Sequence, residues 1–377
     1  MKTLSLFANI GVAEAYLSDI GINVCVANEI VKRRADLYRK IYPDVEMICG
    51  DITSSSIYNS ILASSKKHGV DIVVATPPCQ GMSRAAGVPK EGDERNGLIL
   101  PVFDLVTALK PKYVFIENVK RLLETKVVHN NQCNSVSDFL EYLFGETYHI
   151  RIKVIDTKNY SVPQTRIRAI ILMSRRDLGH TWELPKEDGR IITVREAIGG
   201  LPTLDPFIID ATEKNRLEIF PNYYKFEKLG LAYSRWHKPP RHIKRQVVTM
   251  MHTPPGKTAF DNEWHFPKKA NGEKVRGYLS TYRRLRWEAP ASTVTMDNRK
   301  ISSQNNVHPG NLIGFNTSGE AVYSDARALT LCELMHIMTL PKNWPIPDDT
   351  PEAFLRSVIG EGIPPLFLKK VFEQLLK

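Results

Sequence analysis

The stretch Asp71-Ile-Val-Val-Ala-Thr-Pro-Pro-Cys-Gln80 decides the fold of this chain. Its apolar run, residues 72–76, is typical of a strand buried inside a parallel sheet. The Pro-Pro turn that follows is stiff, and it presents the next side chain, Cys79, at the carboxyl end of that strand. Open α/β sheets hold their ligands at this edge. A cysteine taken alone is more often buried and inert, but this position indicates that Cys79 serves chemistry.

Similar apolar runs recur along the first half of the chain and alternate with amphipathic stretches. Strands are expected at 3–7, 23–27, 46–50, 72–76, 113–116 and 168–173, and helices at 12–20, 32–42 and 56–68. This alternation predicts an α/β fold with a doubly wound, mostly parallel, Rossmann-like sheet.

The alternation stops near residue 186, where Pro-rich, aromatic and basic sequence begins. Helices are expected again at 329–338 and 366–376. A chain of 377 residues exceeds one ordinary domain. We therefore expect a catalytic domain made of residues 1–185 and 322–377, interrupted by a smaller inserted domain, residues 186–321.

Composition excludes several classes of protein. No apolar stretch approaches the roughly 20 residues that a membrane span needs, and the first residues do not resemble a signal peptide. The cysteines are odd in number and form no Cys-x-x-Cys pair, so we expect a reducing cytoplasm and no structural metal; they are Cys25, Cys49, Cys79, Cys133 and Cys332.

The net charge of +10 is concentrated in the expected insertion. Residues 237–300 hold 14 Lys and Arg against five Asp and Glu, a local excess of +9. A solvated basic face is the ordinary explanation, but aromatic residues are interleaved with these charges: Trp264, Tyr278, Tyr282 and Trp287. The combination favours a nucleic-acid partner.

Polar residues end three successive strands of the predicted sheet. The segment Phe7-Ala-Asn-Ile-Gly11 follows the first strand, Glu29 ends the second and Asp51 ends the third. Carboxylates at these ends can accept hydrogen bonds from a ribose and from an adenine amine, whereas each one alone would suggest a helix cap. Together they predict a slot for an adenosine group.

The strand at 113–116 continues into Glu117-Asn-Val119 beside the Cys79 turn. A thiolate can add to carbon 6 of a cytosine and so activate carbon 5 toward an electrophilic methyl group. Charge then develops at nitrogen 3, where Glu117 could supply a proton if burial kept it protonated. Asn118 would position these groups.

At this point the chain resembles the DNA cytosine-5 methyltransferases. The resemblance covers nearly the whole chain in order, and its most specific part is the pairing of Pro77-Pro-Cys-Gln80 with Glu117-Asn-Val119. The other matching segments are 7–11, 28–30, 50–52, 162–168, 327–333 and 359–365.

The resemblance implies S-adenosyl-L-methionine as cofactor, with S-adenosyl-L-homocysteine as product. The residues implied to bind it are Phe7, Asn9, Gly11, Glu29, Ile30, Asp51, Ile52, Pro77, Glu361 and Gly362. Those implied in catalysis are Cys79 as nucleophile, Glu117 as the contact of the flipped base, Asn118, Arg166, and Arg168, which would contact the cytosine carbonyl. DNA contacts are expected from Gln80, Ser83, Arg95, Gln164, Arg283, Arg284 and Arg286.

Two positions depart from the family pattern, and one loop matches it. Asn9 stands where the family usually has Gly, and Glu361 stands where it usually has Asn. Because Asn tolerates positive φ, we expect the turn at Asn9 to survive. Residues 81–97 correspond to the family's mobile loop, which we expect to close over the DNA.

These observations predict an enzyme that methylates carbon 5 of one cytosine, flipped out of a short duplex sequence. We expect a monomer in a bacterial cytoplasm, within a restriction-modification system whose endonuclease forms no stable complex with it. Two alternatives remain open: the tRNA-directed branch of the family, and a DNA-binding protein that has lost the reaction.

Overall fold

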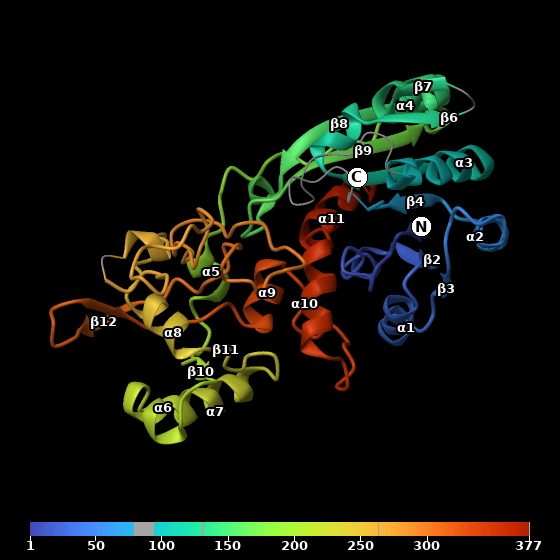
Figure 1. The fold of residues 1–377 in the computed structure, drawn as a ribbon. Helices are drawn as coiled ribbons and strands as arrows, with labels where there is room; N and C mark the ends of the chain where they lie inside the picture. The colour runs from blue at the N-terminus through green and yellow to red at the C-terminus, as the bar shows by residue number, and fades with distance from the viewer. Residues whose placement is uncertain (79–93, 130–131, 263, 377) are drawn as a thin grey trace.

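The computed structural model describes residues 1–78, 94–129, 132–262 and 264–376 (Figure 1). Within these residues, a seven-stranded sheet has the order β3-β2-β1-β4-β5-β9-β8. Its strands are β1 (Lys2–Leu6), β2 (Asn23–Glu29), β3 (Glu46–Cys49), β4 (Ile72–Ala75), β5 (Tyr113–Asn118), β8 (Tyr148–Asp156) and β9 (Ile167–Arg175). The first five are parallel to one another, and β9 runs antiparallel to both β5 and β8. The expected mostly parallel α/β sheet is therefore confirmed.

The central strands are apolar on both faces because helices cover both. Val73 of β4 belongs to a core shared with α2 (Ser55–His68), α3 (Leu100–Leu109) and α4 (Val136–Phe144). Val74, the next residue, points to the opposite face, where it packs with α11 (Pro365–Phe372). This alternation is the period of two of a β-strand, and burial on both sides explains the unbroken apolar run in the sequence.

Most expected elements of this domain are present within two residues of their bounds. The helix expected at 32–42 is α1 (Lys32–Ile41), and the one expected at 329–338 is α9 (Leu331–Ile337). The last expected helix is split into α11 and the 3-10 turn η8 (Glu373–Leu376). The edge strand β8 was not expected, because most of its residues are exposed or half-buried and its sequence is correspondingly mixed.

The prediction of a helix at 12–20 was wrong. The segment forms turns and one short 3-10 helix, η1 (Ser18–Ile20). The amide of Glu14 donates to the carbonyl of Gly11, and the amide of Leu17 donates to that of Glu14, so the bonds span three residues and not four. The Glu14 side chain turns inward to Ser5 and Tyr38, which holds the chain in this tighter path.

The inserted region contains short elements joined by long loops (Figure 1). Its elements are α5 (Val194–Ile198), β10 (Phe207–Ile208), α6 (Glu213–Ile219), α7 (Tyr223–Tyr233), β11 (Arg241–His242), α8 (Lys244–Met251), η7 (Ala259–Asp261), β12 (Leu312–Phe315) and β13 (Ala321–Tyr323). The hairpin of β6 (Lys126–His129) and β7 (Gln132–Ser135) belongs to the first domain, as does the 3-10 segment η4 (Lys120–Glu124). No helix in the described part of the chain is long and apolar enough to cross a membrane.

The two expected domains share a core. Val194 and Ile198 of α5, with Leu285 and Trp287 further along, pack with residues of α9 and α10 (Glu352–Glu361) in one buried cluster. The boundaries expected at 185 and 322 stay predictions, since packing continues across both. A close approach within this shared core is visible at Gly360 of α10, where an added Cβ would lie 2.1 Å from the carbonyl oxygen of Thr295.

We predict that Gly360→Ala destabilises the protein by about 2 kcal/mol, because overpacking against a backbone outweighs the helix propensity that alanine gains. Gly200→Ala is the matched control, because nothing lies within 4 Å of its added Cβ. Urea unfolding should give a lower midpoint for Gly360→Ala alone. Equal midpoints for both variants would contradict this account.

Candidate active site

The carboxyl ends of β1, β2, β4 and β5 meet at the point where the strand order reverses. From β1 the chain moves outward to β2 and β3, and it then crosses back to β4 on the other side of β1. Open α/β sheets bind ligands in a crevice outside the strand ends at such a reversal point, so a crevice is expected at this edge. The expected site residues lie around this crevice.

The turn after β1 has an unusual backbone. Phe7, Asn9 and Gly11 all have positive φ, at 57°, 53° and 80°. The Asn9 side chain donates to the carbonyl of Val358 in α10, and this confirms that Asn supports the turn here. Gly11 is required, because an added Cβ would lie 2.1 Å from the ring of Tyr42.

Glu29 fastens this turn to the end of β2. Its buried carboxylate accepts hydrogen bonds from the backbone amides of Asn9 (3.0 Å) and Val31 (2.8 Å). A carboxylate has about four acceptor positions, so two remain for a ligand. The neighbouring Ile30 side chain is 59% exposed, and it provides apolar surface beside a polar group.

The remaining expected cofactor residues lie at the adjacent strand ends. Asp51, after β3, is exposed and accepts from the amide and hydroxyl of Thr53. Ile52 and Pro77 are buried and provide support more than contact surface. The crevice thus combines carboxylates with apolar surface, as an adenosine group requires.

Glu361, one of the departures from the family pattern, pairs with Arg34 of α1 at 2.8 Å. Burial raises the pKa of the Glu361 carboxyl, and the nearby charge of Glu29 raises it further, whereas Arg34 opposes both. Gly362 follows directly, and a Cβ there would press on Val12. The ion pair therefore joins the end of α10 to the helix after β2 beside the crevice, a contact that an Asn at this position would not form.

The expected catalytic residues converge at the ends of β5 and β9. Glu117 and Arg168 form an ion pair at 2.6 Å with side chains only 10% and 15% exposed. The Asn118 amide donates to the carbonyl of Pro77 at 2.9 Å, so it holds the turn that leads to Cys79. An arginine therefore accompanies the nearly buried Glu117, and the positioning role expected of Asn118 stays a prediction that this bond supports.

Gln164 and Arg166 are both buried and bond to other segments of the chain. Gln164 is fully buried, and its side-chain oxygen accepts from the amide of Val294 at 2.9 Å, so the expectation that it contacts DNA was wrong. Arg166 is 3% exposed and donates to the carbonyls of Val294, Gly360 and Glu361. It joins these segments, and its expected role in catalysis stays a prediction.

The three arginines expected to contact DNA in the insertion differ in their surroundings. Arg284 is wholly buried and donates to the carbonyls of Met250 and His308, so the prediction that it contacts DNA was wrong. Arg286 is exposed, and Arg283 is half-buried and donates to the carbonyl of Leu279. These two remain predictions.

Four expected residues lie where their side chains are not described. Cys79, Gln80 and Ser83 fall outside the described residues, as does most of the expected mobile loop. Arg95 belongs to η3 (Glu94–Ile99), whose first side chains are likewise outside the description. Their roles therefore remain predictions.

Glu14 was missed by the sequence reasoning. It is buried beneath the turn after β1, and both Ser5 and Tyr38 donate to its carboxylate. Burial raises the pKa of the Glu14 carboxyl to about 7. A single Glu between apolar residues 10–13 and Ala15 was the available signal, but an expected surface helix accounted for it equally well.

The family model of the C-5 cytosine-specific DNA methylases matches residues 1–377. The chain belongs to this family. It is an α/β enzyme of the DNA cytosine-5 methyltransferase class, whose members use S-adenosylmethionine. Two of the residues expected in catalysis, Glu117 and Arg168, form an ion pair.

Relatives agree over nearly the whole chain. The Type II methyltransferase M1.HgaI of Avibacterium volantium is 43% identical over 377 residues, which cover 99% of this chain and 97% of that protein. The Type II methyltransferase M1.HphI of Haemophilus parahaemolyticus is 24% identical, with 99% of this chain and 86% of that protein covered.

Solved structures share the fold. A prophage-encoded methyltransferase from Escherichia coli has a TM-score of 0.67 at 16% identity, over 100% of this chain and 98% of its own. The Dnmt2 methyltransferase of S. pombe has a TM-score of 0.56 at 14% identity, over 100% and 98% of the two chains.

Glu14 generates a prediction about pH. Its folded pKa lies above the usual 4.5, so its contribution to stability is fully present below pH 4.5 and is lost as the pH rises toward 7. Glu14→Gln keeps the shape and removes the titration. Relative to this variant, the native protein should lose on the order of 3 kcal/mol between pH 4.5 and pH 7.5. Urea unfolding of both proteins at several pH values measures this, and a constant difference between them would refute it.

Proposed function

We propose that the methyl transfer proceeds through a covalent bond between Cys79 and carbon 6 of a cytosine extruded from duplex DNA. The observation that supports this most is the arrangement behind the Cys79 turn. Asn118 fixes Pro77, and Glu117 and Arg168 form a buried pair at the adjacent strand ends. A thiol delivered by such a rigid turn would meet a base already held by polar side chains.

The crevice fits S-adenosylmethionine. Glu29 retains acceptor positions for the ribose hydroxyls, Asp51 is exposed for the adenine amine, and Ile30 presents apolar surface between them. Phe7, in the strained turn after β1, would pack on the same group. When bound, the cofactor supplies an electrophilic methyl group on a sulfonium and leaves as S-adenosylhomocysteine.

The protein's own residues would handle the electrons and protons of the base. Glu117 takes up a proton as the base binds and passes it to nitrogen 3 while the Cys79 thiolate adds to carbon 6, so that the electron pair is delivered to carbon 5. Carbon 5 takes the methyl group. Loss of the carbon 5 proton to a base then expels the thiolate, and return of the nitrogen 3 proton to Glu117 restores the ring.

Arg168 would have two tasks in this scheme. Without a bound base it neutralises Glu117, a nearly buried carboxylate that would otherwise lie unpaired. With the base in place, the guanidinium can donate to the cytosine carbonyl while it still contacts the carboxylate, because it has five N–H donors. The pair therefore holds the flipped base at two atoms.

The inserted region, residues 186–321, would read the DNA sequence. Its exposed side chains include Arg286 and the large aromatic residues Trp264 (61%) and Tyr278 (68%), which can contact phosphates and bases. Two relatives are named Type II methyltransferases, and by analogy we place this enzyme in a restriction-modification system. It would act as a cytoplasmic monomer, and its cognate endonuclease would recognise the same DNA without a stable complex.

Covalent trapping tests the mechanism. A fluorine at carbon 5 cannot leave as a cation, so elimination stalls and the adduct persists. Duplexes carrying 5-fluorocytosine should form a complex that survives a denaturing gel, needs S-adenosylmethionine to accumulate, and maps to Cys79. Cys79→Ala should abolish the band, and Glu117→Gln should slow methyl transfer by about a hundredfold or more.

The same assay with fluorinated tRNA separates the alternatives. A band with tRNA but with no DNA pool would overturn the choice of DNA as substrate. Undiminished methyl transfer by Cys79→Ala would overturn the covalent mechanism.

The different surroundings of the arginines predict different effects on DNA binding. Arg286→Gln should reduce the salt slope of binding by about one, the change expected for the loss of a single phosphate contact. Lys66→Gln, an exposed change on α2, is the control and should leave the slope unchanged. Titration of duplex DNA at several salt concentrations measures both. An unchanged slope for Arg286→Gln would place the DNA contact elsewhere.

A further inference from the structure

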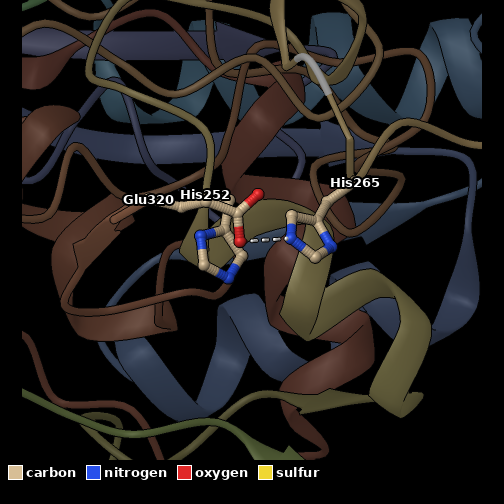
Figure 2. A group of neighbouring side chains, drawn as sticks. All are labelled: His252, His265 and Glu320. Carbon is tan, nitrogen blue, oxygen red and sulfur yellow. Dashed lines mark hydrogen bonds and ion pairs between the residues drawn. The ribbon is translucent and has the colours of Figure 1, made fainter. Parts of the chain in front are cut away.

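Two histidines and a carboxylate from three separate segments of the insertion meet outside the active site. His252 follows α8, His265 lies in the loop after η7, and Glu320 lies in the turn between β12 and β13. One nitrogen or oxygen atom from each lies within 4.8 Å of the other two. Figure 2 shows the two imidazoles and the carboxylate next to one another. Within the described ranges, this is the one such group of three or more metal-ligating side chains.

We propose that His252, His265 and Glu320 form a binding site for a zinc-like divalent ion. Two imidazoles with one carboxylate are a donor set that Zn²⁺ accepts, with water at the fourth position of a tetrahedron. The distance between one pair of ligand atoms agrees with this geometry, because the His265 Nε2 atom lies 3.2 Å from a Glu320 oxygen. Two ligands each about 2.1 Å from a tetrahedral ion are roughly 3.4 Å apart.

Neighbouring groups orient the three side chains by hydrogen bonds, as the groups around a metal site orient its ligands. The Nδ1 atom of His252 donates to the carbonyl of Ala321 at 3.0 Å, and this leaves its Nε2 lone pair as the ligand. Asn316 donates to the Glu320 carboxylate at 2.6 Å, and the pKa of that carboxyl is held below its usual value.

The loop that carries His265 is fixed as well. Asn262 accepts from the amide of His265 at 2.9 Å and donates to the carbonyl of Thr249 in α8. The side chains of His265 and Glu320 are 30% and 23% exposed, so an ion can reach them from solvent. The site would therefore join α8, the 262–265 loop and the β12–β13 hairpin.

Ion binding would change one feature of the cluster. The rings of His252 and His265 are stacked, with centroids 4.1 Å apart and planes 17° from parallel. Imidazole lone pairs lie in the ring plane, so two stacked rings must tilt to share one ion. The orientation of the two rings should therefore change when the ion binds. The signals of the histidine ring protons can report this change, in addition to the measured affinity for the ion.

The sequence alone predicted no metal, since the three residues lie 13 and 55 positions apart in the chain and match no short ligand motif. The fold brings them together because α8 and the β12–β13 hairpin are neighbours, and the Ala321 carbonyl links the hairpin to His252.

The full-length protein, stripped with a chelator, tests the site by Zn²⁺ competition against a chromophoric chelator. One equivalent should bind in the micromolar range or tighter. His265→Ala and Glu320→Gln should each weaken this binding about tenfold or more. His68→Ala is the matched control, because His68 and Glu46 form a pair at the same 3.2 Å without a second histidine, and it should leave the affinity unchanged.

Co²⁺ in place of Zn²⁺ distinguishes this cluster from the cysteines. The expected spectrum has the visible bands of a tetrahedral ion without a thiolate charge-transfer band, and the histidine ring proton signals should shift on binding. The proposal would be overturned if the protein bound neither ion, or if the only bound Co²⁺ showed a thiolate band. It would also be overturned if Glu320→Gln bound Zn²⁺ as tightly as the native protein does. If His265→Ala fails to fold, the nearly isosteric Glu320→Gln still decides the outcome.

Discussion

The guanidinium of Arg166 is the contact on which the arrangement of the site depends. It enters from the segment before β9 and donates to carbonyls of Val294 and of two residues at the end of α10. A buried backbone carbonyl without a donor is costly, and this one side chain donates to three such carbonyls on two segments. The end of α10, thus fixed, places Glu361 against Arg34 beside the cofactor crevice.

Charge in this protein serves stability as much as recognition. The excess of +9 in residues 237–300 includes Arg284, whose charge is buried among carbonyl oxygens. Nearby, Arg327 donates to both Asp325 and Glu333 in a wholly buried cluster. Removal of one member would leave an uncompensated buried charge, which is far more destabilising than the loss of a surface pair. The basic surface offered to DNA is therefore smaller than the sequence count suggests.

The parallel strands and the site at their ends could be predicted because local sequence determines both. The short apolar run 72–75, bounded by turn residues, forms a buried strand, and the residues after such a strand lie at the ligand edge. Glu117 and Asn118 were found in this way, whereas Arg168 was assigned from the family resemblance. Gln164 and Arg284 were not assigned correctly, because burial of a polar side chain depends on partners 24 to 130 residues away. The prediction of a helix at 12–20 was wrong for the same reason. The Glu14 side chain bonds to Tyr38, which lies outside the segment from which that helix was predicted.

The bonds between residues 163–165 and 289–294 affect how such enzymes could exchange specificity. Ala291 exchanges backbone hydrogen bonds with Pro163 and Thr165, and Ala289 accepts from Val194 near the start of the insertion. Backbone hydrogen bonds thus tie the start of the inserted region to residues 289–291, and these residues to the catalytic part. A chimera designed to recognise the DNA sequence of a relative should keep these bonded segments from the enzyme that supplies the catalytic part. The relative's segment should be joined after residue 202 and before residue 284. Evolution by recombination meets the same restriction, so junctions between natural relatives should gather there.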